Sequence, residues 1–190
     1  TVGSGVWVTV GMMVGTAVFY APSIHYGIFW DDPVWYGHAV GKTWWQTLLP
    51  STDFQFYRPL TMLYVWLFMR PDGTFAFAWQ HALQIGLHLL NAILAFLIAG
   101  RLGLSRWAGV AVSLLVASYP FAFQAVAWAA PQQPIVGLWQ TAAWLAYLAA
   151  CPLGELETGD WRLGDKRKYW LLASLPFFLL ALLMQESSVA

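Results

Sequence analysis

The amino-acid sequence predicts an all-α polytopic membrane protein with about five transmembrane helices. Of its 190 residues, 59% are hydrophobic and only 9% are charged. Soluble domains carry about 25% charged residues, so a soluble fold of this composition would lack polar side chains to cover its surface. The 13 Trp residues also suit a bilayer, where amphipathic rings settle at the headgroup level.

Five apolar segments are expected to span the bilayer, whose hydrocarbon core requires about 20 apolar residues per helix. They cover residues 2–21, 75–99, 107–127, 134–152 and 169–184. We expect residues 1–190 to form a single transmembrane domain. Because the sequence has no initiator Met and stops in or just past an apolar run, we also expect it to be part of a longer protein.

A long loop, residues 22–74, separates the first two predicted spans. It contains an apolar run at 60–69 that is too short to cross a membrane. A short apolar helix of this kind is typical of a segment lying along the membrane surface. The sequence therefore predicts an interfacial helix within the first loop.

The basic residues predict the orientation. Six of the nine Lys and Arg residues lie in the loops after the second and fourth spans. In a five-span chain both loops fall on one side, which is cytoplasmic by the positive-inside rule. The first loop is then extracytoplasmic, and we expect a bacterial inner (plasma) membrane with the site facing outward. If residues 60–69 did span, Asp31 and Asp32 would move to the cytoplasmic side.

Composition disfavours nucleic-acid binding and also any disulfide framework or metal–thiolate cluster. The formal net charge is zero, so no basic field indicates nucleic acid as a partner. A single cysteine, Cys151, provides neither a disulfide framework nor a thiolate cluster for a metal.

Asp31 and Asp32 are the first candidate catalytic residues, directly after the apolar Ile28-Phe29-Trp30. Adjacent carboxylates at a membrane surface repel one another and lose hydration, which favours proton binding by one of them. This arrangement suits a general base or a metal ligand. The alternative is a solvated Asp-Asp-Pro turn.

Polar residues line one face of the second predicted span. Offsets of three, four and three residues place His81, Gln84, His88 and Asn91 on the same side of a helix. Polar side chains inside a span usually face the bundle interior or a wet cavity. The alternative role is hydrogen bonding between helices.

Arg58 lies between Tyr57 and Pro59, just before the interfacial run. Its guanidinium would suit bidentate contact with a lipid phosphate or diphosphate; headgroup anchoring or a pair with Asp53 are the alternatives. Glu186 ends the last apolar run and is expected to face outward. It would either orient a metal or substrate, or mark where the helix reaches water.

Six motifs follow one another in a specific order along the chain. They are Asp31-Asp32, Tyr57-Arg58-Pro59-Leu60-Thr61, His88-Leu-Leu-Asn91, Arg101-Leu-Gly, Tyr119-Pro120 with Gln124-Ala-Val-Ala-Trp128, and Gln185-Glu186. Their order resembles the membrane glycosyltransferases of the GT-C superfamily over roughly residues 10–190. The likeness is to the branch that contains protein O-mannosyltransferases, the transmembrane-and-TPR mannosyltransferases and bacterial lipid-linked aminoarabinose transferases.

The resemblance implies transfer of a sugar from a polyprenyl-phosphate donor to a protein, lipid or glycan acceptor outside the cytoplasm. Asp31 or Asp32 would be the general base, and Arg58 would stabilise the leaving phosphate. The first-loop helix would hold the prenyl chain. The expected substrate-binding residues are Tyr57, Arg58, His81, His88, Asn91 and Glu186.

Several positions depart from the family pattern. The family often has His where Tyr119 stands, an acid at Gln124, an Arg near Gln132-Gln133 and a basic residue at Gln185. The donor and acceptor therefore differ from those of better-known members, or activity has been lost. The alternative function is a non-catalytic GT-C-derived accessory subunit in a larger membrane complex. A transporter is disfavoured because no broken-helix repeat is visible.

A metal cofactor is left open by the sequence. Two carboxylates and two histidines are compatible with a divalent ion, but no ligand spacing is specific for one.

Overall fold

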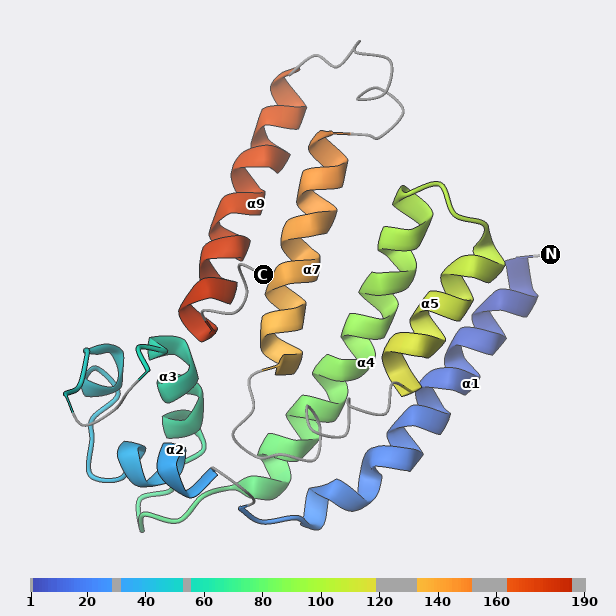
Figure 1. The fold of residues 1–190 in the computed structure, drawn as a ribbon. Helices are drawn as coiled ribbons and strands as arrows, with labels where there is room; N and C mark the ends of the chain where they lie inside the picture. The colour runs from blue at the N-terminus through green and yellow to red at the C-terminus, as the bar shows by residue number, and fades with distance from the viewer. Residues whose placement is uncertain (1, 29–31, 53–55, 119–132, 152–163, 186–190) are drawn as a thin grey trace.

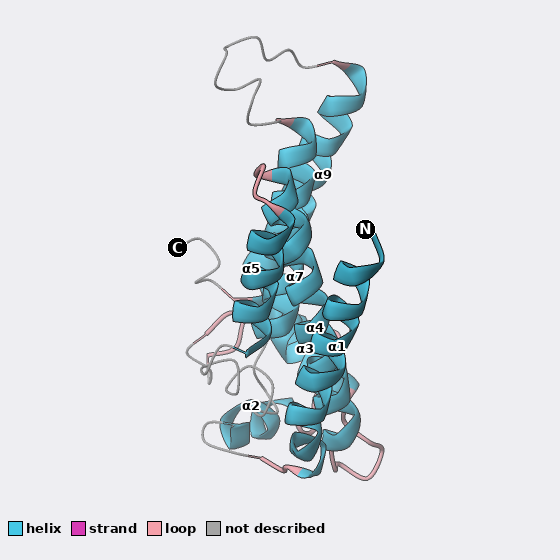
Figure 2. Cartoon of the chain, turned by 90° about the vertical axis from the view of Figure 1, so that its right-hand side faces the viewer, coloured by secondary structure: helices cyan, strands magenta, loops and turns pink. Residues whose placement is uncertain are grey.

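The computed structural model describes residues 2–28, 32–52, 56–118, 133–151 and 164–185 (Figure 1). In these ranges the secondary structure is helical, apart from one isolated bridge between Met69 and Phe75. The all-helical fold class is therefore confirmed. Seen from the side, the helices form a narrow slab (Figure 2).

Within the described ranges, five helices of 13 residues or more form where the apolar segments predict them. They are α1 (Val2–Tyr20), α4 (Phe77–Arg101), α5 (Arg106–Ser118), α7 (Gln133–Ala150) and α9 (Asp165–Met184). Figure 1 shows α4 between α5 and α7, with α1 and α9 on the outside. In the described residues, two helices are long and apolar enough to cross a membrane: α4, and Arg167–Met184 of α9. The second half of the third predicted span, residues 119–127, lies outside the described residues.

The connection between α4 and α5 is a glycine-terminated helix end. Gly103 has a φ of 76°, a conformation that residues with a Cβ rarely adopt. The amide of Leu104 donates to the carbonyl oxygen of Ala99, and the amide of Gly103 donates to that of Gly100. These two bonds form a Schellman motif. The chain therefore turns sharply, and α5 packs back along α4.

The first loop folds into a small helical lobe. It contains η1 (Ala21–His25), α2 (Asp32–Ala39), η2 (Gln46–Leu48) and α3 (Pro59–Leu67). The apolar run at 60–69 forms α3, which starts at a proline because a fixed φ suits the first helical position. Nine residues give a helix of only about 14 Å, far short of a bilayer core.

The lobe packs against the ends of α7 and α9 (Figure 1). Its buried apolar residues come from α2 and α3, and they meet one residue each from α7 and α9. These residues are Trp35, Tyr36, Ala39, Met62, Tyr64, Val65, Val136 and Met184. Burial of this apolar surface holds the lobe at one end of the helix slab and so determines where its polar residues lie.

Candidate functional site

A cluster of buried polar side chains lies where the lobe meets the first turns of α4. We call it the polar cluster; its members are Asp32, Tyr36, Thr61, Tyr64, Gln80, His81 and Gln84. Five of them, Asp32, Thr61, Gln80, His81 and Gln84, have a solvent-exposed fraction of 0%. Burying polar groups is unfavourable unless they are hydrogen-bonded, so such a concentration indicates either a structural network or a binding site.

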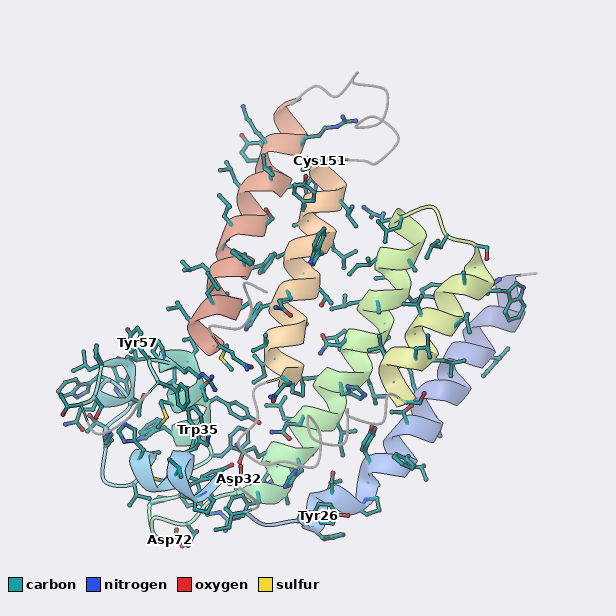
Figure 3. All side chains as sticks on the ribbon, viewed as in Figure 1. Tyr26, Asp32, Trp35, Tyr57, Asp72 and Cys151 are labelled. Atoms are coloured by element: carbon teal, nitrogen blue, oxygen red, sulfur yellow. The ribbon has the colours of Figure 1, made fainter. Side chains whose placement is uncertain are left out.

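Asp32 is the first residue of α2 and is completely buried. Figure 3 shows it between α2 and the lower end of α4. A carboxylate in the first turn of a helix is stabilised by the unpaired amides and the helix dipole. The interpretation of Asp32 as a solvated turn residue is therefore wrong, because the packed lobe excludes water from it. Asp31 lies outside the described residues.

Two tyrosine–glutamine pairs connect the lobe to α4. The hydroxyl of Tyr36 donates to Oε1 of Gln80 at 2.5 Å. Nε2 of Gln84 donates to the hydroxyl oxygen of Tyr64 at 3.3 Å. Burial, and then the negative charge of Asp32, raises the pKa of Tyr36 far above its ordinary value. Burial likewise raises the pKa of Tyr64. Both phenols are therefore neutral at physiological pH; the Tyr36 hydroxyl donates to Gln80, whereas the Tyr64 hydroxyl accepts from Gln84.

The side-chain amide nitrogen of Gln80 is a donor group that the cluster does not use. Its Nε2 is buried and has no hydrogen-bond partner among the described residues. A buried, unused N–H destabilises the folded state, and such groups need an explanation such as a bound ligand. Gln80 therefore offers a hydrogen bond to a polar group that enters the cluster.

Arg58 packs beside the helix that carries Asp32. Its guanidinium carbon lies 5.4 Å from the ring centroid of Trp35 and 4.6 Å from that of Phe56. These two rings are themselves stacked, with centroids 6.1 Å apart. Trp35 is three residues after Asp32, so the same turn of α2 connects the acid to the cation. Stacking on aromatic faces fixes the plane of the guanidinium and keeps its donors aligned.

Tyr57 does not join this arrangement. Its side chain is exposed, and its hydroxyl donates a long bond of 3.3 Å to the carbonyl oxygen of Leu48. Asp53, the expected alternative partner of Arg58, lies outside the described residues.

The polar face of α4 is buried along its length, but it divides into two parts. His81 and Gln84 belong to the polar cluster, and the ring of His81 lies edge-to-face with that of Tyr26 in the first loop, 6.5 Å away. His88 and Asn91 instead bond to neighbouring helices. Nε2 of His88 donates to the carbonyl oxygen of Ala117 at 3.1 Å, and Nδ2 of Asn91 donates to that of Pro134 at 2.7 Å.

The end of α9 reaches the same region through Thr61. The Thr61 hydroxyl donates to the carbonyl oxygen of Met184 at 2.6 Å, between residues 123 positions apart. Glu186 is two residues beyond Met184 and lies outside the described residues, as do Tyr119-Pro120, Gln124 and Gln132. Within the described ranges, no group of three or more His, Cys, Asp or Glu residues is arranged to hold a metal ion.

Sequence reasoning missed three members of the polar cluster, Tyr36, Tyr64 and Gln80, and also Trp35, which packs against Arg58. One signal was available, because Gln80 precedes Gln84 by four residues and so shares the polar face of α4. Tyr36 and Tyr64 carried no such signal, since aromatic residues are frequent throughout this chain.

Comparison of the chain with protein-family models, curated proteins and solved structures gives no match. The function must therefore be inferred from the residues of the site itself.

Proposed function

We propose that this protein is an integral membrane glycosyltransferase of the GT-C type, which transfers a sugar from a polyprenyl-phosphate donor to an extracytoplasmic acceptor. One observation supports this most directly: α2 carries a buried carboxylate, Asp32, and three residues later an aromatic ring, Trp35, that holds the guanidinium of Arg58. A base and a phosphate-binding cation are the two groups that such a reaction needs from the protein.

In the proposed reaction, Asp32 accepts the proton of the acceptor hydroxyl. The acceptor oxygen forms a bond to C1 of the sugar as the bond between C1 and the phosphate oxygen breaks, with inversion at C1. Polyprenyl phosphate leaves, and Arg58 stabilises the negative charge that develops on it. The unused Nε2 donor of Gln80 is suited to a sugar hydroxyl. Asp31 is the alternative base.

The proposed topology has five spans, of which α4 and residues Arg167–Met184 of α9 are long and apolar enough to cross a membrane. The lobe of α2 and α3 lies on the extracytoplasmic side of a bacterial inner membrane. Exposed Trp44 and Trp45 suit contact with headgroups there. The ends of α4 and α9 that carry Arg101 and Lys168 lie on the cytoplasmic side.

The test is turnover in nanodiscs, measured as release of polyprenyl phosphate from a panel of polyprenyl-phosphate sugars. Asp31→Asn, Asp32→Asn and the double variant are compared with Asp72→Asn, which changes an exposed carboxylate in the same loop. Loss of a general base lowers the rate by about 10²–10⁴-fold. We expect this loss in Asp32→Asn and in the double variant, and normal turnover in Asp72→Asn.

Undiminished turnover in the double variant would remove both acids from the mechanism. If no donor in the panel were turned over and membrane proteins co-purified in stoichiometric amounts, the protein would instead be identified as the accessory subunit.

A further inference from the structure

An apolar groove of about 370 Å³ lies between α4, α7 and α9. It is at the end of α4 opposite the polar cluster. Leucine side chains from α4 and α7 line most of it, Trp170 and Phe177 of α9 contribute aromatic rings, and Arg101 lies at its end. The groove is therefore a hydrocarbon-lined slot that ends at a cation.

The helix packing explains why the groove exists. Asn91 bonds to Pro134 at the start of α7, and it lies so close to Gly137 that a Cβ there would be 2.9 Å from Asn91 Nδ2. Beyond this contact, α4 and α7 diverge toward the end of α4 (Figure 1). On the other side, α9 stays against α7, with the rings of Trp139 and Phe177 stacked 6.0 Å apart. The small side chains of Ala142 and Ala146 leave space between these walls.

The dimensions match one leaflet of a bilayer. Leu90 and Arg101 are 11 positions apart on α4, which corresponds to about 16 Å along the helix. Half of a hydrocarbon core is about 15 Å. The lining is also open to the outside, because Leu90, Leu97 and Trp170 are 37%, 46% and 53% exposed.

The positive charge at the end of the groove indicates what kind of lipid headgroup would bind there. Arg101 is in the last turn of α4 and makes no ion pair with another described residue. Its planar guanidinium is suited to bidentate contact with a phosphate. Arg106, Arg167 and Lys168 are near the same ends of α5 and α9, but each has other contacts and none lines the groove, so Arg101 is the cation that the groove itself presents.

We propose that the groove binds one acyl chain of an anionic phospholipid, with the lipid phosphate on Arg101. This lipid is not the sugar donor. Gln80 in the polar cluster is 21 positions before Arg101 on α4, which places the two about 32 Å apart. The site is therefore a separate lipid site, and the proposal stands whether or not the protein transfers sugar.

The test is native mass spectrometry of the detergent-solubilised protein with phosphatidylglycerol or phosphatidylcholine of identical acyl chains. We expect phosphatidylglycerol to bind at least about fivefold more tightly, from the attraction of an anionic headgroup to one well-placed cation. Arg101→Gln should abolish this preference, whereas Arg106→Gln, a matched exposed arginine outside the lining, should keep it.

Two further variants test the acyl chain. Ala142→Trp fills the floor of the groove, and Leu97→Gln places a polar group on its exposed wall; both should weaken binding of either phospholipid. Circular dichroism checks that each variant is folded. If Ala142→Trp does not fold, the binding measured for Leu97→Gln tests the proposal. Unchanged binding in the folded variants would overturn the proposal.

Three other outcomes would also overturn it. Equal losses in Arg101→Gln and Arg106→Gln would indicate general surface attraction. Displacement of phosphatidylglycerol by equimolar polyprenyl phosphate would assign the groove to that lipid. A dimer that excludes phospholipid would show that a second copy of the chain covers the groove.

Discussion

The hydroxyl of Tyr36 donates a 2.5 Å hydrogen bond to Oε1 of Gln80, and this bond joins α2 in the first loop to α4 in the helix slab. The two residues are 44 positions apart, and both are buried. Because Asp32 is one turn before Tyr36 on the same short helix, the bond also helps to hold the proposed base against α4.

Tyr36→Phe is expected to destabilise the protein. It removes the donor and leaves Oε1 of Gln80 buried beside an Nε2 that already has no partner among the described residues. An unsatisfied buried acceptor costs about 1–3 kcal/mol. The measurement is thermal unfolding in detergent. Tyr57→Phe is the control, because that side chain is 56% exposed and its loss should change stability by less than about 0.5 kcal/mol. Equal effects would contradict the assigned role of Tyr36.

Alkaline pH is expected to weaken the attachment of the lobe. Burial raises the pKa of Tyr36 and Tyr64 in the folded protein above the unfolded value of about 10. As pH rises past about 10, the unfolded state therefore loses these protons first, and stability that is complete below that pH falls. The midpoint temperature of Tyr36→Phe/Tyr64→Phe should decline less steeply above about pH 10 than that of the wild type. Parallel declines would show that other groups dominate.

Thr61→Val is expected to release the end of α9 from α3. Valine has nearly the same shape but cannot donate to the carbonyl oxygen of Met184, so the loss should be about 1–3 kcal/mol. Thr61→Ser keeps the hydroxyl and should recover most of that loss. Hydrogen exchange at the amides near Met184 provides a local readout, and it should accelerate in the valine variant alone. If serine and valine behaved alike, lost packing rather than the hydrogen bond would be the cause.

Gly137→Ala is expected to push α7 away from α4. The added methyl group would lie 2.9 Å from Nδ2 of Asn91 and displace it from the carbonyl oxygen of Pro134. Overpacking of this kind costs about 1–3 kcal/mol. Gly86→Ala is the matched control, since a Cβ there meets no atom within 4 Å and alanine stabilises a helix by about 0.5–1 kcal/mol. Thermal unfolding should therefore shift in opposite directions for the two variants.

Arg58→Lys is expected to impair donor use although it keeps the positive charge. A lysine ammonium has no plane to pack against the rings of Trp35 and Phe56, and it binds phosphate as a point charge rather than bidentately. Turnover with a polyprenyl-phosphate sugar should fall by about tenfold, the equivalent of one charge-assisted hydrogen bond. Arg70→Lys, at an exposed position in the same loop, should leave turnover unchanged. Equal turnover in all three proteins would exclude a bidentate role for Arg58.

The helices and the shared face of α4 were accessible from the sequence because both are local properties. An apolar run of about 20 residues predicts a long helix wherever it occurs, and the observed α1, α4, α7 and α9 start and end within a few residues of the predicted segments. The spacing of His81, Gln84, His88 and Asn91 predicted a common face because a helix repeats every 3.6 residues. All four are buried.

The partners of those residues depended on long-range packing. His88 and Asn91 bond to carbonyls of α5 and α7, whereas His81 and Gln84 meet the lobe, and no local pattern distinguishes the two pairs. The burial of Asp32 and the bond between Tyr36 and Gln80 follow from apolar packing of α2 and α3 against the ends of α7 and α9. Spacing along one helix determines which side chains share a face. Only the packing of distant segments determines which side chains are buried from water and which polar groups meet.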